Sequence, residues 1–368
     1  MNRGEKAAQL VRALWFHGPL TRREMEEILG VSRPTLDKLV KDLLRRGLIQ
    51  EFGERRERGG RPAVLFGLNQ RARFAVGADL ELPGLYLVVA DLGGTIHAER
   101  ALRLSEPLAS PHEALRELAA SLTAWLDELE IPRHLVAGVG VGMPIFFEGN
   151  AVTVKGKNLP TWIRVPAREI LQEELGVPVA VGHDVHFMAL AEAEVEGLTD
   201  RVLLYVAFRS GIRGDVRMGA CLLIRGQLYR GAHGNGGTLH GAFVDPEEIE
   251  GLPAAEAAAV VADKLSPHIV QAVALLDPDV VVLNTRELGE LGRPVEGAVR
   301  ARVGAALRGE PIGPVELRRA RVTEAPGALG AAMAVVRELF DHPEQLLAGE
   351  VVAGGKPSVS LPSSGRKP

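Results

Sequence analysis

Cysteine is almost absent from this sequence, since Cys221 is the only one among 368 residues. A single thiol cannot form an internal disulfide, and it excludes a metal site built from several cysteines. We expect Cys221 to be a small, buried, apolar side chain.

Long apolar runs are also missing. No stretch reaches the ~18 consecutive apolar residues that a membrane-spanning helix needs. The N-terminal stretch has no apolar core followed by a small-residue cleavage site. The sequence therefore predicts a cytoplasmic protein with no membrane partner.

Charge is present in both signs but is unevenly distributed. Residues 1–73 contain 16 Lys and Arg against 9 Asp and Glu, a net charge of +7. The remaining residues contain 27 against 38, a net charge of −11. A basic head on an acidic body predicts that only the head meets a polyanion.

Residues 21–47 have the pattern of a helix-turn-helix. Thr21 and Glu24 are spaced as a capping box at the start of one short amphipathic helix, and Gly30 ends that helix. The stretch VSRPTLDKLVKDLLRRG predicts a second helix, and two strand-like runs around the loop RRERGGRP follow it. Residues 1–72 are therefore predicted to form a winged helix-turn-helix domain.

The residue types in this domain suit duplex DNA. Arginine can bind guanine in a bidentate manner, and threonine can contact bases or phosphates. A wing with glycines beside arginine suits insertion into a narrow minor groove. The alternative is a helical protein–protein module with solvated surface charges. The predicted DNA-binding residues are Arg33, Thr35 and Lys38 on the second helix and Arg58, Gly59, Gly60, Arg61 and Pro62 in the wing.

From residue 74 onward the pattern changes to alternating strands and helices. Three strand-like runs, a helix, a strand, a helix, a strand and a helix are followed by a second round in the same order. Two such halves resemble the two-lobed α/β fold of actin and hexokinase, which is ribonuclease-H-like and has a ligand cleft between its lobes. We expect lobes over residues 73–190 and 191–342, and a disordered tail over residues 343–368.

Five short stretches, taken in their order along the chain, carry a resemblance to a known family. The chain resembles the ROK family, which groups bacterial repressors with sugar kinases. The stretches are GGRP (59–62), GVGVGMP (138–144), KNLPTW (157–162), VAVGHD (179–184) and YRGAHGNGGTLHG (229–241).

The stretch DLGGT (91–95) looks like a phosphate-holding turn, which in kinases of this fold joins the first two strands. With FAVGADLE (74–81) as the first strand, Asp79 takes the acidic position and Leu82 and Pro83 fall in the loop. Neither residue can replace a glycine whose backbone amide holds a phosphate. DLGGT is then predicted to be a hairpin turn between the second and third strands.

Two further nucleotide contacts of the family are altered in this sequence. RSGIR (209–213) stands in place of the second phosphate loop, with arginines at two glycine positions. Asn284 and Thr285 stand where the family has a Gly-Gly pair against adenosine. The resemblance therefore implies a kinase-like domain that does not use ATP and needs no cofactor.

The sugar pocket that the resemblance implies is only partly kept. The resemblance places the family's sugar-contacting asparagine at Asn158 and its catalytic aspartate at Asp184. His183 replaces an asparagine, Thr238 replaces a glutamate, and Gly241 takes the column of a histidine. The expected ligand-binding residues are Asn158, His183, Asp184, Thr238 and His240.

Altered or weakened sugar binding follows from these changes. The family's cysteine-rich zinc segment is missing from the sequence. His233, His240 and Asp184 are residue types that bind metals, but without cysteines or regular spacing we expect unliganded cleft histidines.

The leading hypothesis is a transcriptional regulator, expected to be a repressor, that binds a double-stranded DNA operator as a homodimer or a dimer of dimers. Its non-catalytic kinase-like domain would sense a sugar-like or other small polar ligand. One alternative is a ligand-independent dimeric DNA-binding regulator. The other is an active sugar kinase with Asp184 as its general base.

Overall fold

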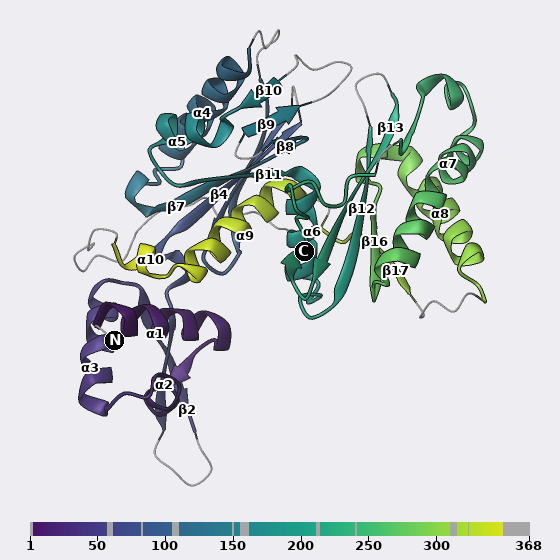
Figure 1. The fold of residues 1–368 in the computed structure, drawn as a ribbon. Helices are drawn as coiled ribbons and strands as arrows, with labels where there is room; N and C mark the ends of the chain where they lie inside the picture. The colour runs from purple at the N-terminus through teal and green to yellow at the C-terminus, as the bar shows by residue number, and fades with distance from the viewer. Residues whose placement is uncertain are drawn as a thin grey trace, which may run out of the picture.

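The computed structural model describes residues 3–56, 62–81, 84–104, 110–148, 151–154, 162–210, 214–239, 241–309, 315–322 and 324–348. Figure 1 shows a small N-terminal domain and two larger lobes, each built around its own β-sheet. The N-terminal domain lies below the first lobe, on the side away from helices α7 and α8 of the second lobe.

The N-terminal domain is a winged helix-turn-helix, as predicted. Thr21 caps its second helix in a capping box with Glu24, and Gly30 ends that helix in the left-handed conformation. Its three strands pair in the order β1-β3-β2. Its elements are α1 (Arg3–His17), β1 (Leu20–Thr21), α2 (Arg22–Leu29), α3 (Arg33–Arg45), β2 (Ile49–Arg55) and β3 (Ala63–Leu68).

The first lobe is a five-stranded sheet in the order β11-β7-β4-β5-β6. Helices α4 and α5 cover one of its faces. A second, three-stranded sheet of β8, β9 and β10 was not predicted. The elements are β4 (Phe74–Glu81), β5 (Gly84–Asp91), β6 (Ile96–Arg103), α4 (Pro111–Glu128), β7 (Val136–Met143), β8 (Phe146–Glu148), β9 (Ala151–Val154), β10 (Trp162–Val165), α5 (Ala167–Leu175) and β11 (Val179–His183), with 3-10 helices η1 (Gln70–Ala72) before β4 and η2 (Arg133–Leu135) before β7.

The second lobe has a sheet in the order β14-β13-β12-β16-β17, with β15 paired to β13. Helices α7 and α8 pack on one face. Helix α6, most of which the sequence prediction places in the first lobe, packs on the other face of this sheet. The elements are α6 (Asp184–Val195), β12 (Val202–Ser210), β13 (Val216–Ile224), β14 (Gln227–Leu228), β15 (Phe243–Val244), η3 (Pro246–Glu248), α7 (Ala254–Leu276), β16 (Val280–Asn284), η4 (Arg286–Leu291), α8 (Gly292–Ala306) and β17 (Glu316–Arg319).

Helix α7 is the one helix among the described residues that is long and apolar enough to cross a membrane by length and composition. Its apolar side chains Val261, Leu265 and Ile269 are fully buried in the core of the second lobe. This packing is that of a core helix in a globular domain.

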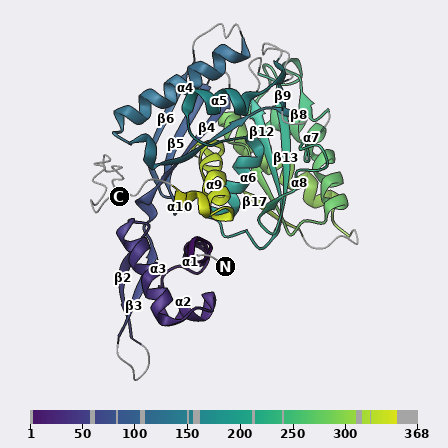
Figure 2. The same cartoon turned by 60° about the vertical axis from the view of Figure 1, so that its left-hand side comes forward.

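Helix α9 (Pro326–Asp341), which the sequence prediction places in the second lobe, packs on the sheet of the first lobe instead. The backbones are in contact, since a Cβ on Gly77 of β4 would lie 1.7 Å from the carbonyl oxygen of Ala328. Helix α9 also packs on α6, where a Cβ on Gly330 would lie 1.7 Å from the carbonyl oxygen of Phe187. The views in Figures 1 and 2 both place α9 between the first sheet and α6.

The prediction of a disordered tail is wrong for the first residues of that segment, because helix α10 (Glu344–Ala348) forms there. Leu346 of this helix is 2% exposed and belongs to the same apolar cluster as Leu10 of α1. Arg46, at the end of α3, donates a hydrogen bond to the carbonyl oxygen of Leu347. These tertiary contacts order a segment that is too short to be stable as an isolated helix.

The segment DLGGT forms the predicted hairpin turn between β5 and β6. One carboxylate oxygen of Asp91 accepts hydrogen bonds from the backbone N–H of Gly93 at 2.9 Å and of Thr95 at 3.0 Å. The backbone amides that would bind a phosphate are thus occupied by the turn's own aspartate. Cys221 is fully buried in β13, as predicted.

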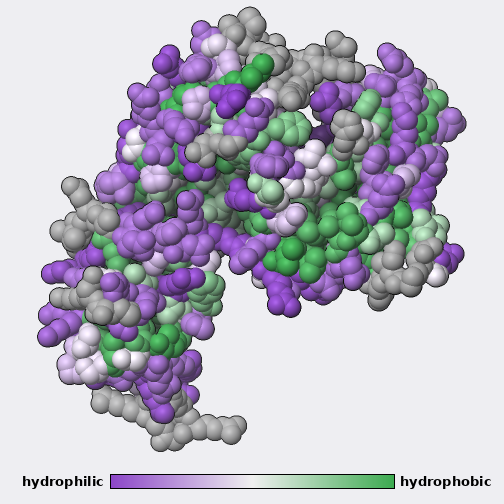
Figure 3. All heavy atoms as spheres, viewed as in Figure 1, coloured by the Kyte–Doolittle hydropathy of each residue, from purple (hydrophilic) through white to green (hydrophobic). Residues whose placement is uncertain are grey.

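Figure 3 shows that the face in view is mostly hydrophilic. Apolar side chains gather over the lower end of the β12–β13 region and on parts of the winged helix domain.

Candidate functional site

The exposed face of α3 is the first candidate site. Arg33, Thr35 and Lys38 all point to solvent, as predicted. Lys41 is also exposed, three residues after Lys38 on the same helix, and the sequence analysis missed it. The sequence signal that could have identified Lys41 is its i, i+3 spacing from Lys38, which places both lysines on the same face of the helix.

Arg33 is held by carboxylates in this structure. Its guanidinium lies 3.1 Å from Glu26 and 3.5 Å from Asp37. Because these pairs are largely exposed, they contribute little stability and exchange readily for a phosphate or a base. Thr35 shares a hydrogen bond of 3.0 Å with the Ser32 hydroxyl.

The wing is formed by β2 and β3, which extend away from the two lobes (Figure 2). Pro62 is exposed at the start of β3. Arg55, at the end of β2, pairs with Glu24 and helps a backbone hydrogen bond from Thr21 to lower the pKa of Glu24. The predicted wing residues Arg58, Gly59, Gly60 and Arg61 lie outside the described residues, so their DNA-contacting role remains a prediction.

The second candidate site is a cluster of charged side chains between the lobes, here called the interlobe cluster. Three of its members come from the second lobe and two from the first. It consists of Asp79 and Glu81 of β4, Asp184 at the start of α6, Arg209 of β12 and Glu287 of η4.

Arg209 is at the centre of the interlobe cluster. One guanidinium nitrogen lies 2.9 Å from Glu81 and 3.1 Å from Asp184, and another lies 2.8 Å from Glu287. Its side chain is 17% exposed. Because Glu81 belongs to the first lobe and Arg209 to the second, this arginine ties the two lobes together.

Burial and neighbouring charges shift the pKa values of three carboxyl groups of the cluster in different directions. Burial raises the pKa of Asp79 well above its usual value, more than Arg209 lowers it. Burial likewise raises the pKa of Glu287 to about 8. Burial opposes ionisation of Asp184 too, but Arg209 and His183 outweigh it and lower the pKa of that carboxyl. At neutral pH, Asp184 is therefore ionised, whereas Glu287, whose pKa is about 8, mostly holds a proton.

The Asp79 carboxyl group packs against the first turn of helix α9. It is 1% exposed, and one of its oxygens has no hydrogen-bond partner within the described chain. A Cβ on Gly327 would lie 2.0 Å from its other oxygen, so the first turn of α9 rests on this carboxyl group. An unpartnered buried oxygen is tolerated most easily on a protonated acid.

Two histidines lie beside Asp184. The Nδ1 atom of His183 is 2.7 Å from Asp184 Oδ1, and the rings of His183 and His186 are 5.2 Å apart. Burial, together with His183, lowers the pKa of His186 to about 4, so His186 is neutral at pH 7. Its Nε2 lies 3.2 Å from the carbonyl oxygen of Gly236, which connects α6 to the loop after β14.

The structure describes three of the five predicted ligand-binding residues. His183 and Asp184 are in contact, but Thr238 is exposed and donates its hydroxyl hydrogen bond to the Asn235 carbonyl. Asn158 and His240 lie outside the described residues. The sequence analysis missed Glu81 and Glu287, because the chain gives no local sign that these strand ends meet.

Asn284, predicted to stand in the adenosine site, is a buried structural residue. Its amide nitrogen donates to the Tyr205 hydroxyl at 2.9 Å, and its amide oxygen accepts from the backbone N–H of Arg286 at 3.0 Å. These bonds hold the start of η4, which positions Glu287 toward Arg209.

The chemistry available to the interlobe cluster is limited by Arg209. A general base needs a pKa near the working pH and access to the proton it removes. Asp184 has a lowered pKa and is paired with Arg209 and His183. Within the ranges that the structure describes, no group of three or more His, Cys, Asp or Glu side chains is arranged to hold a metal.

The raised pKa of Glu287 predicts a pH dependence of stability. Between about pH 5 and pH 8 the folded protein keeps a proton that the unfolded chain has lost, so stability falls as pH rises. The Glu287→Gln side chain cannot bind that proton, so the free energy of unfolding of this variant should fall by about 3–4 kcal/mol less across this range. Thermal denaturation at several pH values measures the difference.

The exposed Glu174→Gln on α5 is the control, and its pH profile should run parallel to that of the original protein. Parallel profiles for Glu287→Gln and the original protein would contradict the assignment of a proton to Glu287.

Comparison with known proteins adds three findings. Residues 84–253 match the sequence model of the ROK family. The chain is 28% identical to the uncharacterised protein y4fQ of Sinorhizobium fredii, over 98% of this chain and 95% of that protein. It is 27% identical to a putative xylose repressor of a Caldicellulosiruptor species, over 64% of this chain and 58% of that protein.

The fold is similar to that of a ROK family transcriptional regulator described as a homologue of the Escherichia coli Mlc protein. The TM-score is 0.69, with 16% identity, and the match covers 94% of this chain and 99% of that one. The matched segment spans little more than half the length of the xylose repressor. The structural likeness therefore establishes a shared architecture, including the two-lobed domain.

Proposed function

This chain carries a ROK family domain, and on that premise we propose that it is a sequence-specific DNA-binding transcriptional regulator that acts as a repressor. The observation that carries the proposal is the exposed face of α3, which presents Arg33, Thr35, Lys38 and Lys41. The segment that contains this helix, residues 1–73, has a net charge of +7. Such a helix in a winged helix-turn-helix enters the major groove.

The DNA partner in this proposal is a palindromic operator. A homodimer, or a dimer of dimers, presents two copies of α3 to half-sites about 34 Å apart, which is one turn of DNA. The wing residues Arg58 and Arg61 contact the adjacent minor groove. The protein acts in the cytoplasm, where its operator is found.

The ROK domain acts in this proposal as a sensor rather than as an enzyme. A sugar-like or other small polar effector binds near His183 and Asp184, with Asn158, Thr238 and His240 as further contacts. The name of the xylose repressor, to which this chain is similar, supports the sugar class. The ion pair between Arg209 and Asp184 supports a non-catalytic role, because it engages the carboxylate that a sugar kinase would use as its base.

We expect Lys38→Ala and Lys41→Ala each to weaken operator binding about equally for all DNA sequences. Each should also reduce the slope of log affinity against log salt by about 1, because each lysine neutralises one phosphate. Footprinting on genomic DNA identifies the operator, and fluorescence anisotropy over a salt series measures the slopes.

Arg116→Ala on α4 removes an exposed arginine far along the chain from α3 and is the matched control. It should leave both affinity and slope unchanged. Absence of any sequence-preferring DNA binding at moderate salt would refute the proposal itself.

A sugar kinase is the second candidate, because Asp184 is kept. Incubation with ATP and a panel of hexoses and pentoses distinguishes the two functions. Sugar-dependent ATP consumption that Asp184→Asn abolishes would establish the kinase, and its absence would favour the sensor. Thermal-shift screening of sugars separates the sensor from a ligand-independent regulator, for which no sugar changes the melting temperature.

A further inference from the structure

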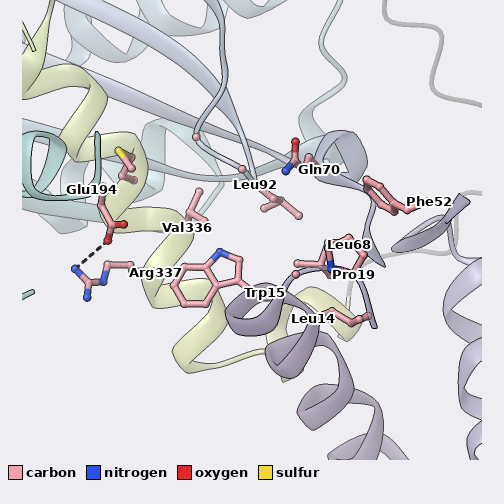
Figure 4. Close-up of a pocket in the computed structure, with 14 residues that line it drawn as sticks. Leu14, Trp15, Pro19, Phe52, Leu68, Gln70, Leu92, Glu194, Val336 and Arg337 are labelled. Atoms are coloured by element: carbon pink, nitrogen blue, oxygen red, sulfur yellow. Dashed lines mark ion pairs between the residues drawn. The ribbon is translucent and has the colours of Figure 1, made fainter. Parts of the chain in front are cut away.

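A cavity of about 310 Å³ lies where the winged helix domain meets the first lobe (Figure 4). This junction cavity is at the small end of the ~300–1,000 Å³ range of ligand pockets. Trp15 and Phe52 line it from the winged helix domain, residues 92–94 from the β5–β6 turn, and Met333 and Arg337 from α9. A molecule in this cavity would therefore touch both sides of the junction at once.

Most of the cavity wall is apolar, and its polar groups lie at particular places. Figure 4 shows Arg337 and Glu194 at one end and Leu14, Pro19 and Phe52 toward the other. The guanidinium of Arg337 lies 3.4 Å from the Glu194 carboxylate. Since this cation and this anion offset each other, a ligand with a net charge would leave one of them without a partner, at a cost in free energy. The cavity therefore favours a neutral ligand.

A ring-shaped ligand suits the middle of the cavity. The indole of Trp15 is stacked on Phe340, with ring centroids 4.6 Å apart and an interplanar angle of 11°. Figure 4 shows its nitrogen on the side that faces Leu92 and Val336. The indole N–H and the side-chain amide of Gln70 are hydrogen-bonding groups among the apolar side chains of this part of the wall. A ring with one hydrogen-bonding end would fill the space and meet these groups.

Two packed helices connect the junction cavity to the interlobe cluster. Helix α6 begins at Asp184 in the cluster and carries Glu194 to the cavity. Helix α9 lies against Asp79 at Gly327, in its first turn, and carries Met333 and Arg337 to the cavity. The two backbones touch at Gly330, so neither helix can shift far without the other.

We propose that the junction cavity is a binding site for a neutral, ring-bearing small molecule with one hydrogen-bonding end. Its occupancy biases the position of the winged helix domain relative to the first lobe and so changes DNA affinity, since a ligand shifts an equilibrium by its differential affinity for the two states. The effect on DNA rests on the proposed function, whereas the binding site itself does not.

Fluorescence titration of the full chain tests the site. The probes are prodan, a neutral naphthalene dye with one carbonyl acceptor, and anilinonaphthalene sulfonate, an anionic dye of similar ring size. We expect prodan to bind saturably at one site per chain and the anionic dye to bind at least 10-fold more weakly. Equal affinity of the two dyes would overturn the assignment of a neutral site.

Two variants locate the binding. Met333→Trp fills the cavity and should weaken prodan at least 10-fold, whereas Glu338→Trp adds the same side chain at an exposed position on α9 and should leave binding unchanged. Prodan binding that survives in Met333→Trp would overturn the site. Glu194→Gln is a milder change that removes the carboxylate paired with Arg337, which still donates to the Gly226 carbonyl oxygen. It should tighten binding of the anionic dye about 10-fold, and unchanged binding would contradict the preference for a neutral ligand.

The coupling to DNA is measured separately, by operator anisotropy with and without saturating prodan. We expect at least a 3-fold change in DNA affinity for the original protein and none for Met333→Trp. Prodan binding with unchanged DNA affinity would overturn the coupling. A protein that binds prodan but no operator at all would instead mark the failure of the proposed function.

Discussion

Arg209→Met is expected to lower the free energy of unfolding by about 3–5 kcal/mol. The guanidinium pairs with Glu81, Asp184 and Glu287, and its side chain is only 17% exposed. Removing one partner of a buried ion pair leaves uncompensated buried charge, which is strongly destabilising. Urea denaturation followed by intrinsic fluorescence measures the loss.

The loss should shrink as the pH is lowered toward about 4. Arg209 is the group that most lowers the pKa of Asp184, so in the variant this carboxyl takes up a proton more readily in place of the lost pairing. Arg116→Met is the control, because Arg116 is 65% exposed and its pair with Glu174 is worth about 1 kcal/mol or less. A stability of Arg209→Met within about 1 kcal/mol of the original would refute the central role of this arginine.

The same variant tests whether the interlobe cluster could serve as a kinase site. Freeing Asp184 from Arg209 removes one obstacle to its use as a base, but other changes remain in the chain. Asn284 is bonded to Tyr205, and Leu82 and Pro83 stand in the sequence where the resemblance places the first phosphate loop. Arg209→Met is therefore not expected to consume ATP in the presence of sugars.

The winged helix domain was predictable because its signals are local. Thr21, Glu24 and Gly30 stand at cap positions that only a short helix between them explains. The main strands and helices of both lobes were predictable for the same reason, since each has its own apolar period. The strands β8 to β10 were missed because each has only three or four residues.

The interlobe cluster was not predictable from sequence patterns. Glu81, Arg209 and Glu287 are far apart in the sequence and meet only because two sheets place their strand ends face to face. The resemblance identified Arg209 as an unusual residue in a phosphate loop, but not the carboxylates that it would bind. Long-range pairing of charges depends on tertiary structure, which composition and periodicity do not encode.

Helix α9 shows how the end of the chain joins all three parts of the molecule. Its first turn lies on Asp79, its middle packs on β4 and α6, and its last turn reaches α1 through Phe340. A regulator needs such a physical link if an event in one domain is to alter another. The contact between Phe340 and Trp15 is the step in this chain of contacts that crosses into the winged helix domain.

Phe340→Ala is expected to lower stability by about 3–5 kcal/mol and to separate the unfolding of the winged helix domain from that of the lobes. Phe340 is fully buried, and its ring is stacked on Trp15 at 4.6 Å. Loss of the ring leaves a cavity between α9 and α1, so the two parts should melt in two transitions rather than one. Differential scanning calorimetry, with Trp15 fluorescence as the domain-specific signal, detects the split.

Phe16→Ala is the matched control, since Phe16 is next to Trp15 in the chain but 59% exposed. Its substitution should change stability by about 0.5 kcal/mol or less and leave a single transition. If Phe340→Ala also melts in one transition, then α10 and Arg46 suffice to hold the winged helix domain to the lobes. That result would contradict the proposal that the contact between Phe340 and Trp15 transmits changes in the lobes to DNA binding.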